Sequence, residues 1–356
     1  MLYIRADGNT DIGMGHVMRC LSIAEAAAQL NQDDMPIFIT ADEGCRPLIE
    51  DRGFKNIVLN TDYKDMMSEL RMLEQIFDAR YDRVLVDSYQ VSNKYFRALR
   101  KFVWVACLED MGQAYPVNLL INYNIYAPKL KEKYQMLDCN EQILNSKRLP
   151  DRVLLGLEYM PLRKDFQKPA VYNIKDKVTD VIITTGGSDP CFAAAALADA
   201  FIENPFLSKQ DIKLHIVSGP FNRFSEELNK KYGDCKSIVI HENVKDMRGL
   251  FLQSDVVISA AGSTIYEVSA LGVPMIIFYF AENQRQGAET FAALTDILNA
   301  GCFANEGRIV ADRAMEALER CVRDKSYRES LCRQEKKLID GKGAYRLAKQ
   351  LIGKGQ

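Results

Sequence analysis

The sequence predicts an α/β protein built from two doubly wound parallel-sheet domains. Short apolar runs of strand length alternate with longer segments in which apolar residues recur every three or four positions, which is typical of β-α-β units. This alternation fills the first 110 residues and starts again near residue 180. In addition, 356 residues exceed what one hydrophobic core usually supports. We therefore expect two domains in tandem.

The first half contains a predicted helix between its first two predicted strands. This helix covers residues 17–30, and Val17, Cys20, Leu21 and Ala24 fall on one of its faces. We expect that face to pack on the sheet. The predicted strands of this half are 2–4, 37–40, 57–59, 84–86 and 103–108.

The second half repeats the pattern after a weaker stretch at 128–177, where we place the domain boundary. Its predicted strands are 181–184, 214–217, 238–240, 256–259 and 275–278. Residues 313–352 are charged and helical in pattern, with breaks at Gly341 and Gly343, and such a tail could pack on either domain. The expected division is a domain at 1–150, a domain at 151–325 and a helical segment at 326–356.

The composition excludes several classes of protein. The 46 Lys and Arg residues nearly balance the 48 Asp and Glu residues, so we expect no partner among nucleic acids or anionic membranes. No apolar run reaches the length of a membrane span, and the N-terminus does not resemble a signal peptide. We therefore expect a cytoplasmic monomer.

The nine cysteines include no Cys-x-x-Cys pair, which argues against both a disulfide framework and a zinc site. We expect free thiols, among them Cys139, and no bound metal.

Ligands of open parallel sheets bind beyond the carboxyl ends of the strands, so the residues after each strand are the candidates for a site. The first such loop runs from Arg5 through Asp7, Gly13 and Gly15 to His16 and on to Arg19. It is neither a dinucleotide fingerprint nor a phosphate-binding P-loop, so we expect no cofactor. A neutral imidazole near a helix N-terminus can act as a base. His16 is such a candidate, although it could instead cap or pack the helix.

The strand at 84–86 is followed by Asp87 and Tyr89, which could hold His16 or a sugar hydroxyl. A turn cap is an equally good interpretation of Asp87. Glu109 and Asp110 end the next strand with the same ambiguity.

The second domain offers three further segments. Gly187 and Ser188 lie in a glycine turn after strand 181–184, although such turns are common in α/β proteins. Gly262, Ser263 and Thr264 precede a predicted helix whose free amides would suit a diphosphate, and Glu267 could bind ribose or complete a capping box. Asn283 and Gln284 follow another strand, where they could face a ligand or simply begin a solvated helix.

Together these motifs resemble the PseG and SpsG family of the MurG-like superfamily, whose architecture is GT-B, with two Rossmann-like domains facing a cleft. The resemblance is carried most specifically by Gly13-Met14-Gly15-His16 with Arg19-Cys20, and by Gly186-Gly187-Ser188-Asp189-Pro190. It also includes 5–7, 86–89, 158–163, 259–264 with Glu267, 282–284 and 340–344.

The resemblance implies hydrolysis of a UDP-sugar, UDP-2,4-diacetamido-2,4,6-trideoxy-β-L-altropyranose, by inverting C1–O cleavage without a metal. In this role His16 is the base that deprotonates water, and Asp87 and Tyr89 are secondary catalytic candidates. The implied substrate contacts are Arg5, Asp7, Gly13, Gly15, Arg19, Gly187, Ser188, Gly262, Ser263, Thr264, Glu267, Asn283 and Gln284. The first domain would take the sugar and the second UDP.

Two other functions remain open at this point. A GT-B glycosyltransferase would use the same base on an acceptor hydroxyl instead of water. A protein that binds a nucleotide-sugar without catalysis would keep the same contacts.

Overall fold

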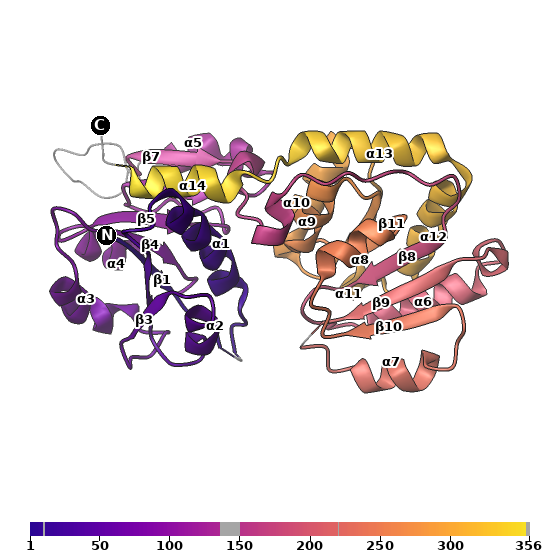
Figure 1. The fold of residues 1–356 in the computed structure, drawn as a ribbon, viewed down its shortest axis with the longest axis horizontal. Coiled ribbons are helices and arrows are strands. Elements are labelled where there is room, and N and C mark those ends of the chain that lie inside the picture. Colours follow the sequence, from indigo (N-terminus) through magenta and orange to yellow (C-terminus); the bar gives the residue numbers. More distant parts are fainter. Residues whose placement is uncertain (10, 136–149, 220, 354–356) are drawn as a thin grey trace. The chain divides into compact units, whose positions relative to one another are not determined.

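The computed structural model describes residues 1–9, 11–135, 150–219 and 221–353 (Figure 1). The chain forms two compact units. Unit 1 comprises residues 1–164 and 341–356, and unit 2 comprises residues 165–340. Each unit contains a parallel sheet, so the predicted fold class is confirmed. Cys139 lies outside the described residues.

Unit 1 has a seven-stranded parallel sheet in the order β3-β2-β1-β4-β5-β6-β7. The direction of winding reverses between β1 and β4, whose last residues, Ala6 and Asp87, are paired. The strands are β1 (Leu2–Ala6), β2 (Ile37–Thr40), β3 (Lys55–Val58), β4 (Arg83–Asp87), β5 (Trp104–Leu108), β6 (Leu119–Asn122) and β7 (Arg152–Leu155).

The first helix of unit 1 buries the face that its spacing predicts, with Val17, Cys20, Leu21 and Ala24 in the core. The α-helices of this unit are α1 (Gly15–Leu30), α2 (Arg46–Glu50), α3 (Leu70–Ile76), α4 (Asn93–Leu99), α5 (Lys131–Gln135) and α14 (Gly343–Ile352). Short 3-10 helices lie at Met66–Glu69, Ala127–Leu130 and Leu157–Tyr159, and a further one, Lys164–Gln167, spans the boundary between the two units.

Unit 2 has a six-stranded parallel sheet in the order β10-β9-β8-β11-β12-β13, which reverses between β8 and β11. Its strands are β8 (Asp180–Thr184), β9 (Lys213–Ser218), β10 (Ile238–Glu242), β11 (Val256–Ala260), β12 (Met275–Tyr279) and β13 (Asn299–Cys302). Its helices are α6 (Ala193–Glu203), the 3-10 helix Leu207–Lys209, α7 (Ser225–Tyr232), α8 (Met247–Gln253), α9 (Thr264–Leu271), α10 (Glu282–Leu294), α11 (Phe303–Glu306), α12 (Arg308–Arg323) and α13 (Lys325–Leu338).

The sequence pattern did not predict three of the strands, namely β6, β7 and β13. Each has only four residues. β7 lies in the stretch that we assigned to the domain boundary, and β13 contains Gly301 and Ala300, which have low strand propensity. Their pairing to a neighbouring strand, rather than local preference, keeps these segments extended.

The compact units differ from the expected division at 150 and 325. Unit 1 continues to residue 164, because β7 pairs with β6 and completes its sheet. The helical tail does not form a separate segment. Helices α12 and α13 belong to unit 2, and the chain re-enters unit 1 at Gly341, so that α14 packs beside α1 (Figure 1).

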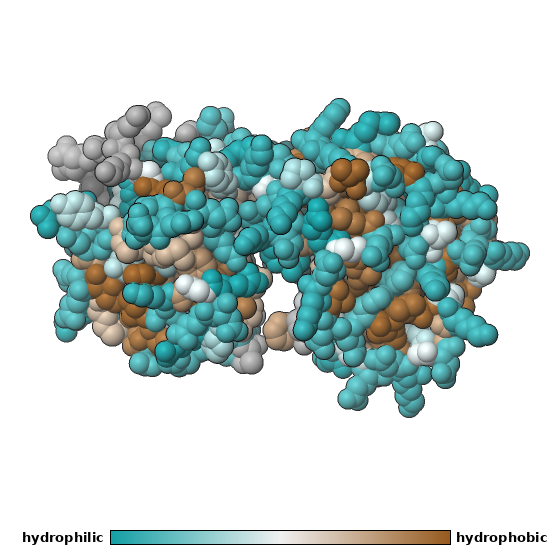
Figure 2. Space-filling model, in the orientation of Figure 1, coloured by the Kyte–Doolittle hydropathy of each residue, from teal (hydrophilic) through white to brown (hydrophobic). Residues whose placement is uncertain are grey.

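The face of the molecule in Figure 2 carries mainly hydrophilic residues, with smaller hydrophobic areas between them. Among the described residues, no helix combines the length and the apolar character that crossing a bilayer requires.

Candidate functional site

The topology of unit 1 brings two distant loops together at the point where its sheet reverses. β1 and β4 are adjacent and parallel, so the residues that follow both strands meet at the same edge. Asp7 follows β1, α1 begins at Gly15, and Asp87 is the last residue of β4. This is the position at which open α/β sheets bind ligands.

His16 and Asp87 are in direct contact at this edge. Nδ1 of His16 lies 2.7 Å from Oδ1 of Asp87, and both residues are buried. A carboxylate accepts hydrogen bonds and cannot donate them, so we assign the Nδ1–H tautomer to His16. This tautomer leaves Nε2 as the ring nitrogen that can accept a proton. The pair therefore has the arrangement of a base held by an acid.

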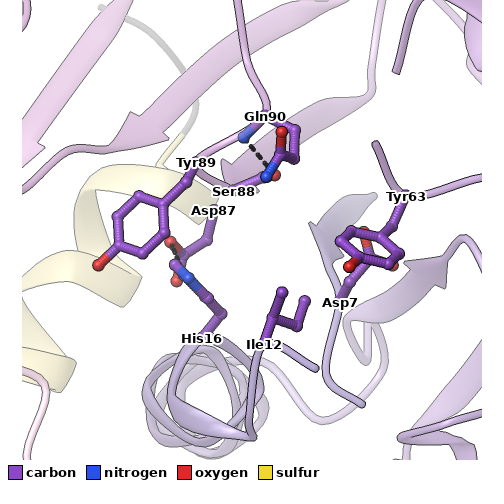
Figure 3. Close-up of a pocket in the computed structure, with 8 residues that line it drawn as sticks. All are labelled: Asp7, Ile12, His16, Tyr63, Asp87, Ser88, Tyr89 and Gln90. Atoms are coloured by element: carbon purple, nitrogen blue, oxygen red, sulfur yellow. Dashed lines mark hydrogen bonds and ion pairs between the residues drawn. The ribbon is translucent and has the colours of Figure 1, made fainter. Parts of the chain in front are cut away.

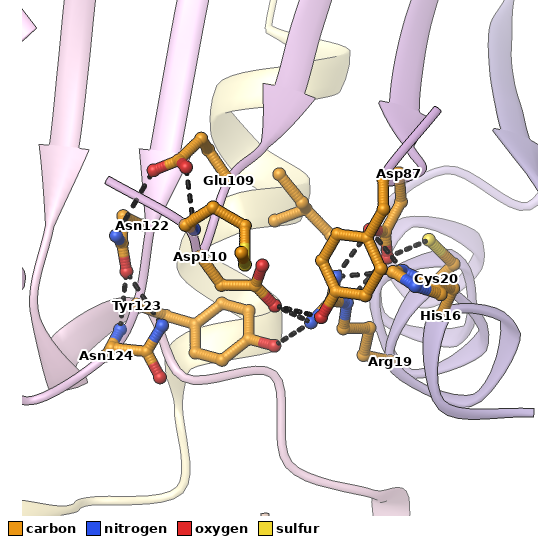
Figure 4. A network of polar contacts seen from close by, with 12 residues as sticks. His16, Arg19, Cys20, Asp87, Glu109, Asp110, Asn122, Tyr123 and Asn124 are labelled. Carbon is orange, nitrogen blue, oxygen red and sulfur yellow. Dashed lines mark hydrogen bonds and ion pairs between the residues drawn. The ribbon is translucent and has the colours of Figure 1, made fainter. Parts of the chain in front are cut away.

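Arg19 binds the same carboxylate (Figure 4). Its Nε lies 2.6 Å from Oδ2 of Asp87, and its Nη2 lies 2.5 Å from Oδ1. Burial raises the pKa of Asp87, but the charge of Arg19 and, after it, the contact with His16 outweigh burial and hold that pKa well below its usual range. The Cys20 thiol donates to Oδ2 at 3.5 Å. Asp87 is thus ionised and fixed.

Arg19 also connects Asp87 with a second carboxylate, that of Asp110. Nη1 of Arg19 donates to Oδ2 of Asp110 at 2.9 Å and to the Tyr123 hydroxyl at 2.6 Å. The Tyr89 hydroxyl donates to the same oxygen of Asp110 at 3.0 Å. Burial, followed by the charge of Asp110, raises the pKa of Tyr89, so its hydroxyl remains a donor. This network connects His16, through Asp87 and Arg19, with Asp110.

Tyr89 lies directly beside His16. Its ring meets the His16 ring edge to face, with centroids 4.6 Å apart and planes at 78°. The Tyr89 side chain is 54% exposed, so its outer face is open to a ligand. Among the sequence candidates, Asp87 contacts the imidazole through its carboxylate and Tyr89 through its ring.

A pocket opens beside His16 (Figure 3). Tyr89, Ser88 and Gln90 come from the segment after β4, and Tyr63 lies across from them. Its lining consists of Asp7, Ile12, His16, Tyr63, Asp87, Ser88, Tyr89 and Gln90. The pocket therefore combines two aromatic rings, an apolar side chain and several polar groups, a composition typical of small-molecule sites.

Arg5 does not reach this pocket, which corrects its assignment as a substrate contact. Its side chain is 0% exposed and binds Glu69 through Nε and Nη2, at 2.9 and 2.7 Å from Oε2. Its Nη1 donates to Asp7 at 2.6 Å. Tyr95 donates to the other oxygen of Glu69. Arg5 therefore stabilises the core of unit 1, because its guanidinium already donates hydrogen bonds to Glu69 and Asp7.

Asp7 lines the pocket but is held by the protein on both carboxylate oxygens. Oδ2 accepts from Arg5, and Oδ1 accepts from the backbone amide of Ala41 at 2.7 Å. In the same loop, Gly13 has φ of +72°, a conformation that side chains other than glycine rarely adopt. Gly15 begins α1 and has open space where a side chain would stand.

In unit 2, the loop after β8 places Gly187 and Ser188 at the surface. Next to them, Asp189 accepts from the backbone amides of Ala193 and Ala194 at 2.8 and 2.9 Å. The carboxylate of Asp189 therefore occupies amides at the start of α6 that could otherwise bind an anion.

The start of α9 differs from that of α6. The residue that precedes this helix is Ser263, and its side chain makes no capping hydrogen bond. Gly262 and Thr264 are partly exposed there, while Glu267 is buried one turn into the helix. Because β11 and β8 are the strands at which the second sheet reverses, this helix start lies at the ligand-binding position of its own unit.

Asn283 and Gln284 lie in the first turn of α10. The Asn283 side chain is exposed. Oε1 of Gln284 accepts from the backbone amide of Phe280 at 2.9 Å, so this side chain already supports the chain before the helix.

Several site residues were not identified from the sequence. Ile12, Tyr63, Ser88 and Gln90 line the pocket but were not predicted as site residues, although Ser88 lies within the motif at 86–89. Tyr123 follows β6, a strand that the sequence analysis missed. Recognition of β6 would have drawn attention to Tyr123 as a residue at the end of a strand. Among the described residues, no group of three or more His, Cys, Asp or Glu side chains is arranged to hold a metal.

Comparisons with known proteins agree with this architecture. Residues 181–351 match the family model of the glycosyltransferase family 28 C-terminal domain. Among solved structures, the chain is similar to MurG of Acinetobacter baumannii, with a TM-score of 0.63 and 15% identity over 98% of each chain. This likeness shows the fold.

Curated relatives have a higher sequence identity to this chain than MurG does. A protein of Methanocaldococcus jannaschii named "Uncharacterized protein MJ1062" is 26% identical over 80% of this chain, but the match spans only 56% of that relative. The spore coat polysaccharide biosynthesis protein SpsG of Bacillus subtilis is 25% identical over 97% of this chain and 95% of its own length.

A third relative carries an activity in its name. The UDP-2,4-diacetamido-2,4,6-trideoxy-β-L-altropyranose hydrolase of Campylobacter jejuni is 21% identical over 81% of this chain and 94% of its own length. The chain is thus a homologue of the SpsG protein and of this hydrolase, PseG, and it has the two-domain α/β fold of the MurG-like GT-B proteins.

Proposed function

We propose that the protein hydrolyses a UDP-linked diacetamido-trideoxy sugar to the free sugar and UDP, with His16 as the base, in the synthesis of pseudaminic acid or a related sugar. The observation that carries this proposal is the contact between His16 and Asp87 beside a pocket at the reversal point of the first sheet. The name of the Campylobacter relative supplies the substrate class.

In the proposed reaction, Nε2 of His16 takes a proton from water while the water oxygen attacks C1 of the sugar. The bond between C1 and the β-phosphate oxygen breaks, its electron pair stays on that oxygen, and UDP leaves. Attack opposite the leaving group inverts the configuration at C1. Asp87 stabilises the imidazolium that forms, because its carboxylate faces Nδ1.

Unit 2 would hold UDP at the start of α9. This assignment rests on the contrast between two helix starts at the same sheet edge. Asp189 occupies amides of α6, whereas the side chain of Ser263 leaves α9 without such a cap. Backbone amides at a helix N-terminus stabilise a diphosphate leaving group. Glu267 would accept from ribose, and Asn283 would lie near the sugar or the β-phosphate.

A glycosyltransferase is the second candidate, because the family model that matches residues 181–351 is a glycosyltransferase domain. In that reaction the same base would deprotonate an acceptor hydroxyl. The two functions differ in one observable, which is whether UDP is released when water is the only acceptor.

The test is UDP release from UDP-2,4-diacetamido-2,4,6-trideoxy-β-L-altropyranose with no acceptor present, in the presence and absence of EDTA. The hydrolase proposal expects rapid release in both conditions and its loss in His16→Asn. His215→Asn is the matched control, because His215 lies in β9 and binds Asp180 and His241. Tight UDP binding without release would favour the transferase.

A further inference from the structure

The side chain of Arg19 lies close to the base itself as well as to the acid. Nη2 of Arg19 is 2.9 Å from Nδ1 of His16. Both nitrogens approach the same oxygen, Oδ1 of Asp87, at 2.5 and 2.7 Å. One carboxylate oxygen of Asp87 therefore contacts both a permanently charged guanidinium and an imidazole (Figure 4).

This sharing changes the charge balance at His16. A buried carboxylate alone would stabilise the imidazolium and favour a base that is already protonated. Here the guanidinium neutralises that carboxylate through two parallel hydrogen bonds. A protonated His16 would also place a second positive charge 2.9 Å from Nη2 of Arg19.

We propose that Arg19 is a positioning residue that makes protonation of His16 less favourable by sharing Asp87 with it. This inference deepens the proposed function and rests on it only for the effect on turnover, since the charge of His16 can be measured without substrate.

The anchoring of Arg19 supports this role. Asp110 and Tyr123 hold Nη1 from the side opposite to Asp87, so the guanidinium is fixed by contacts at both ends. The Arg19 side chain is only 16% exposed, which limits screening of its charge by water. A surface arginine would lack both properties.

The other titratable groups near His16 are acids, phenols and one thiol. Asp7, after β1, lines the pocket and is paired with Arg5. Tyr89, after β4, packs on the imidazole, and Tyr63 lines the pocket opposite. Cys20 of α1 donates to Asp87. Within the described ranges, the recorded polar contacts of the His16 ring are those with Asp87 and Arg19.

The experiment is an NMR titration of the His16 imidazole in the full chain, with His16→Asn used to assign its signals among the three histidines. In Arg19→Gln, His16 should take up its proton at a pH higher by roughly one unit. Arg19→Lys keeps the charge and should remain near the wild type. Arg52→Gln is the matched control, because Arg52 forms an ion pair at the surface with Glu25 of α1, the helix that carries His16 and Arg19.

A second comparison covers the case in which Arg19→Gln does not fold because Asp87 is left buried without its partner. Asp87→Asn and Asp87→Asn/Arg19→Gln differ only in the cation, and His16 should take up its proton at higher pH in the double variant. An unchanged titration in a folded Arg19→Gln protein, or in this pair, overturns the proposal.

The titration also separates this inference from the proposed function. If the titration shifts but no UDP is released from any substrate, the hydrolase proposal fails alone. If hydrolysis depends on His16 but removal of Arg19 moves neither the titration nor the acidic limb of the pH–rate profile, the inference about Arg19 fails alone.

Discussion

Nδ1 of His16 and Oδ1 of Asp87 lie 2.7 Å apart, although 71 positions separate the two residues in the sequence. The contact follows from the pairing of β1 with β4, which places the start of α1 next to the last residue of β4. The same pairing creates the sheet reversal that favours ligand binding. The pairing of β1 with β4 therefore determines both the sheet reversal and the position of the proposed base.

The first prediction concerns the acid of this pair. Asp87→Asn keeps the shape of the side chain but removes the charge that orients His16 and stabilises its imidazolium. We expect kcat for UDP release to fall by roughly 10²- to 10⁴-fold. Binding of UDP should be unchanged in calorimetry, because the proposed UDP contacts lie in unit 2. Asp33→Asn, an exposed position of unit 1, is the control, and near-normal kcat in Asp87→Asn would contradict the role of Asp87.

A second prediction follows from the burial of Arg5. Arg5→Met leaves Glu69 buried without its cation, which should lower the free energy of unfolding by about 3–5 kcal/mol. Part of this loss should return in Arg5→Met/Glu69→Leu, because Glu69 is then no longer a buried charge without a partner, whereas Asp7 still lacks its cation. Urea unfolding measures both. If Arg5→Met instead weakened substrate binding and left stability intact, Arg5 would be a substrate contact after all.

The third prediction concerns Glu335 in α13, which is 0% exposed and whose carboxylate, among the described residues, has at most a weak contact with the backbone of Met275. Burial raises the pKa of Glu335 well above its usual value. The folded state therefore binds this proton more tightly than the unfolded state. The contribution of Glu335 to stability should consequently fall as pH rises from about 4.5 through its folded-state pKa.

Glu335→Gln removes this dependence. The variant should be more stable than the wild type at pH 8, and the difference should become small near pH 4, where the carboxyl is protonated in both the folded and the unfolded state. Glu316→Gln, an exposed position of α12, is the control for the loss of an acid. A wild type whose stability has the same pH dependence as Glu335→Gln would refute this account.

A fourth prediction tests the attachment of α14 to unit 1. A Cβ added to Gly343 would stand 2.1 Å from the carbonyl oxygen of Met160, and backbone atoms cannot move aside easily. Gly343→Ala should therefore lower the free energy of unfolding by roughly 2 kcal/mol or more. Gly15→Ala is the matched control, since a Cβ there meets nothing within 4 Å. Equal stability of the two variants would argue against this packing.

Hydrophobic periodicity predicted most of the fold. Strands with several branched apolar residues, such as β2 and β11, were predicted to within one residue of their ends. Their apolar composition matches their burial in the sheet. β13 was missed, because its Asn299, Gly301 and Cys302 have no strand pattern and only pairing with β12 keeps it extended. The place of α14 in unit 1 depends on packing that no local pattern encodes.

The candidate site was predictable to a different extent. Position after a strand singled out His16, Asp87 and Tyr89, and the structure brings the three together. The same reasoning could not separate Arg5 from Arg19, because both fall in the segment from Arg5 to Arg19 that the sequence predicts as one loop, whereas the structure places Arg5 in β1 and Arg19 in α1. Arg5 turns into the core towards Glu69, whereas Arg19 follows His16 by one helical turn and therefore faces Asp87.

The central claim is that His16 directs water to C1 of the sugar. The most direct measurement is hydrolysis of UDP-2,4-diacetamido-2,4,6-trideoxy-β-L-altropyranose in water enriched in ¹⁸O, followed by mass spectrometry of both products. Our account predicts one ¹⁸O atom in the free sugar, none in UDP, and no turnover by His16→Asn. Label in the phosphate of UDP, or full turnover without His16, would contradict it.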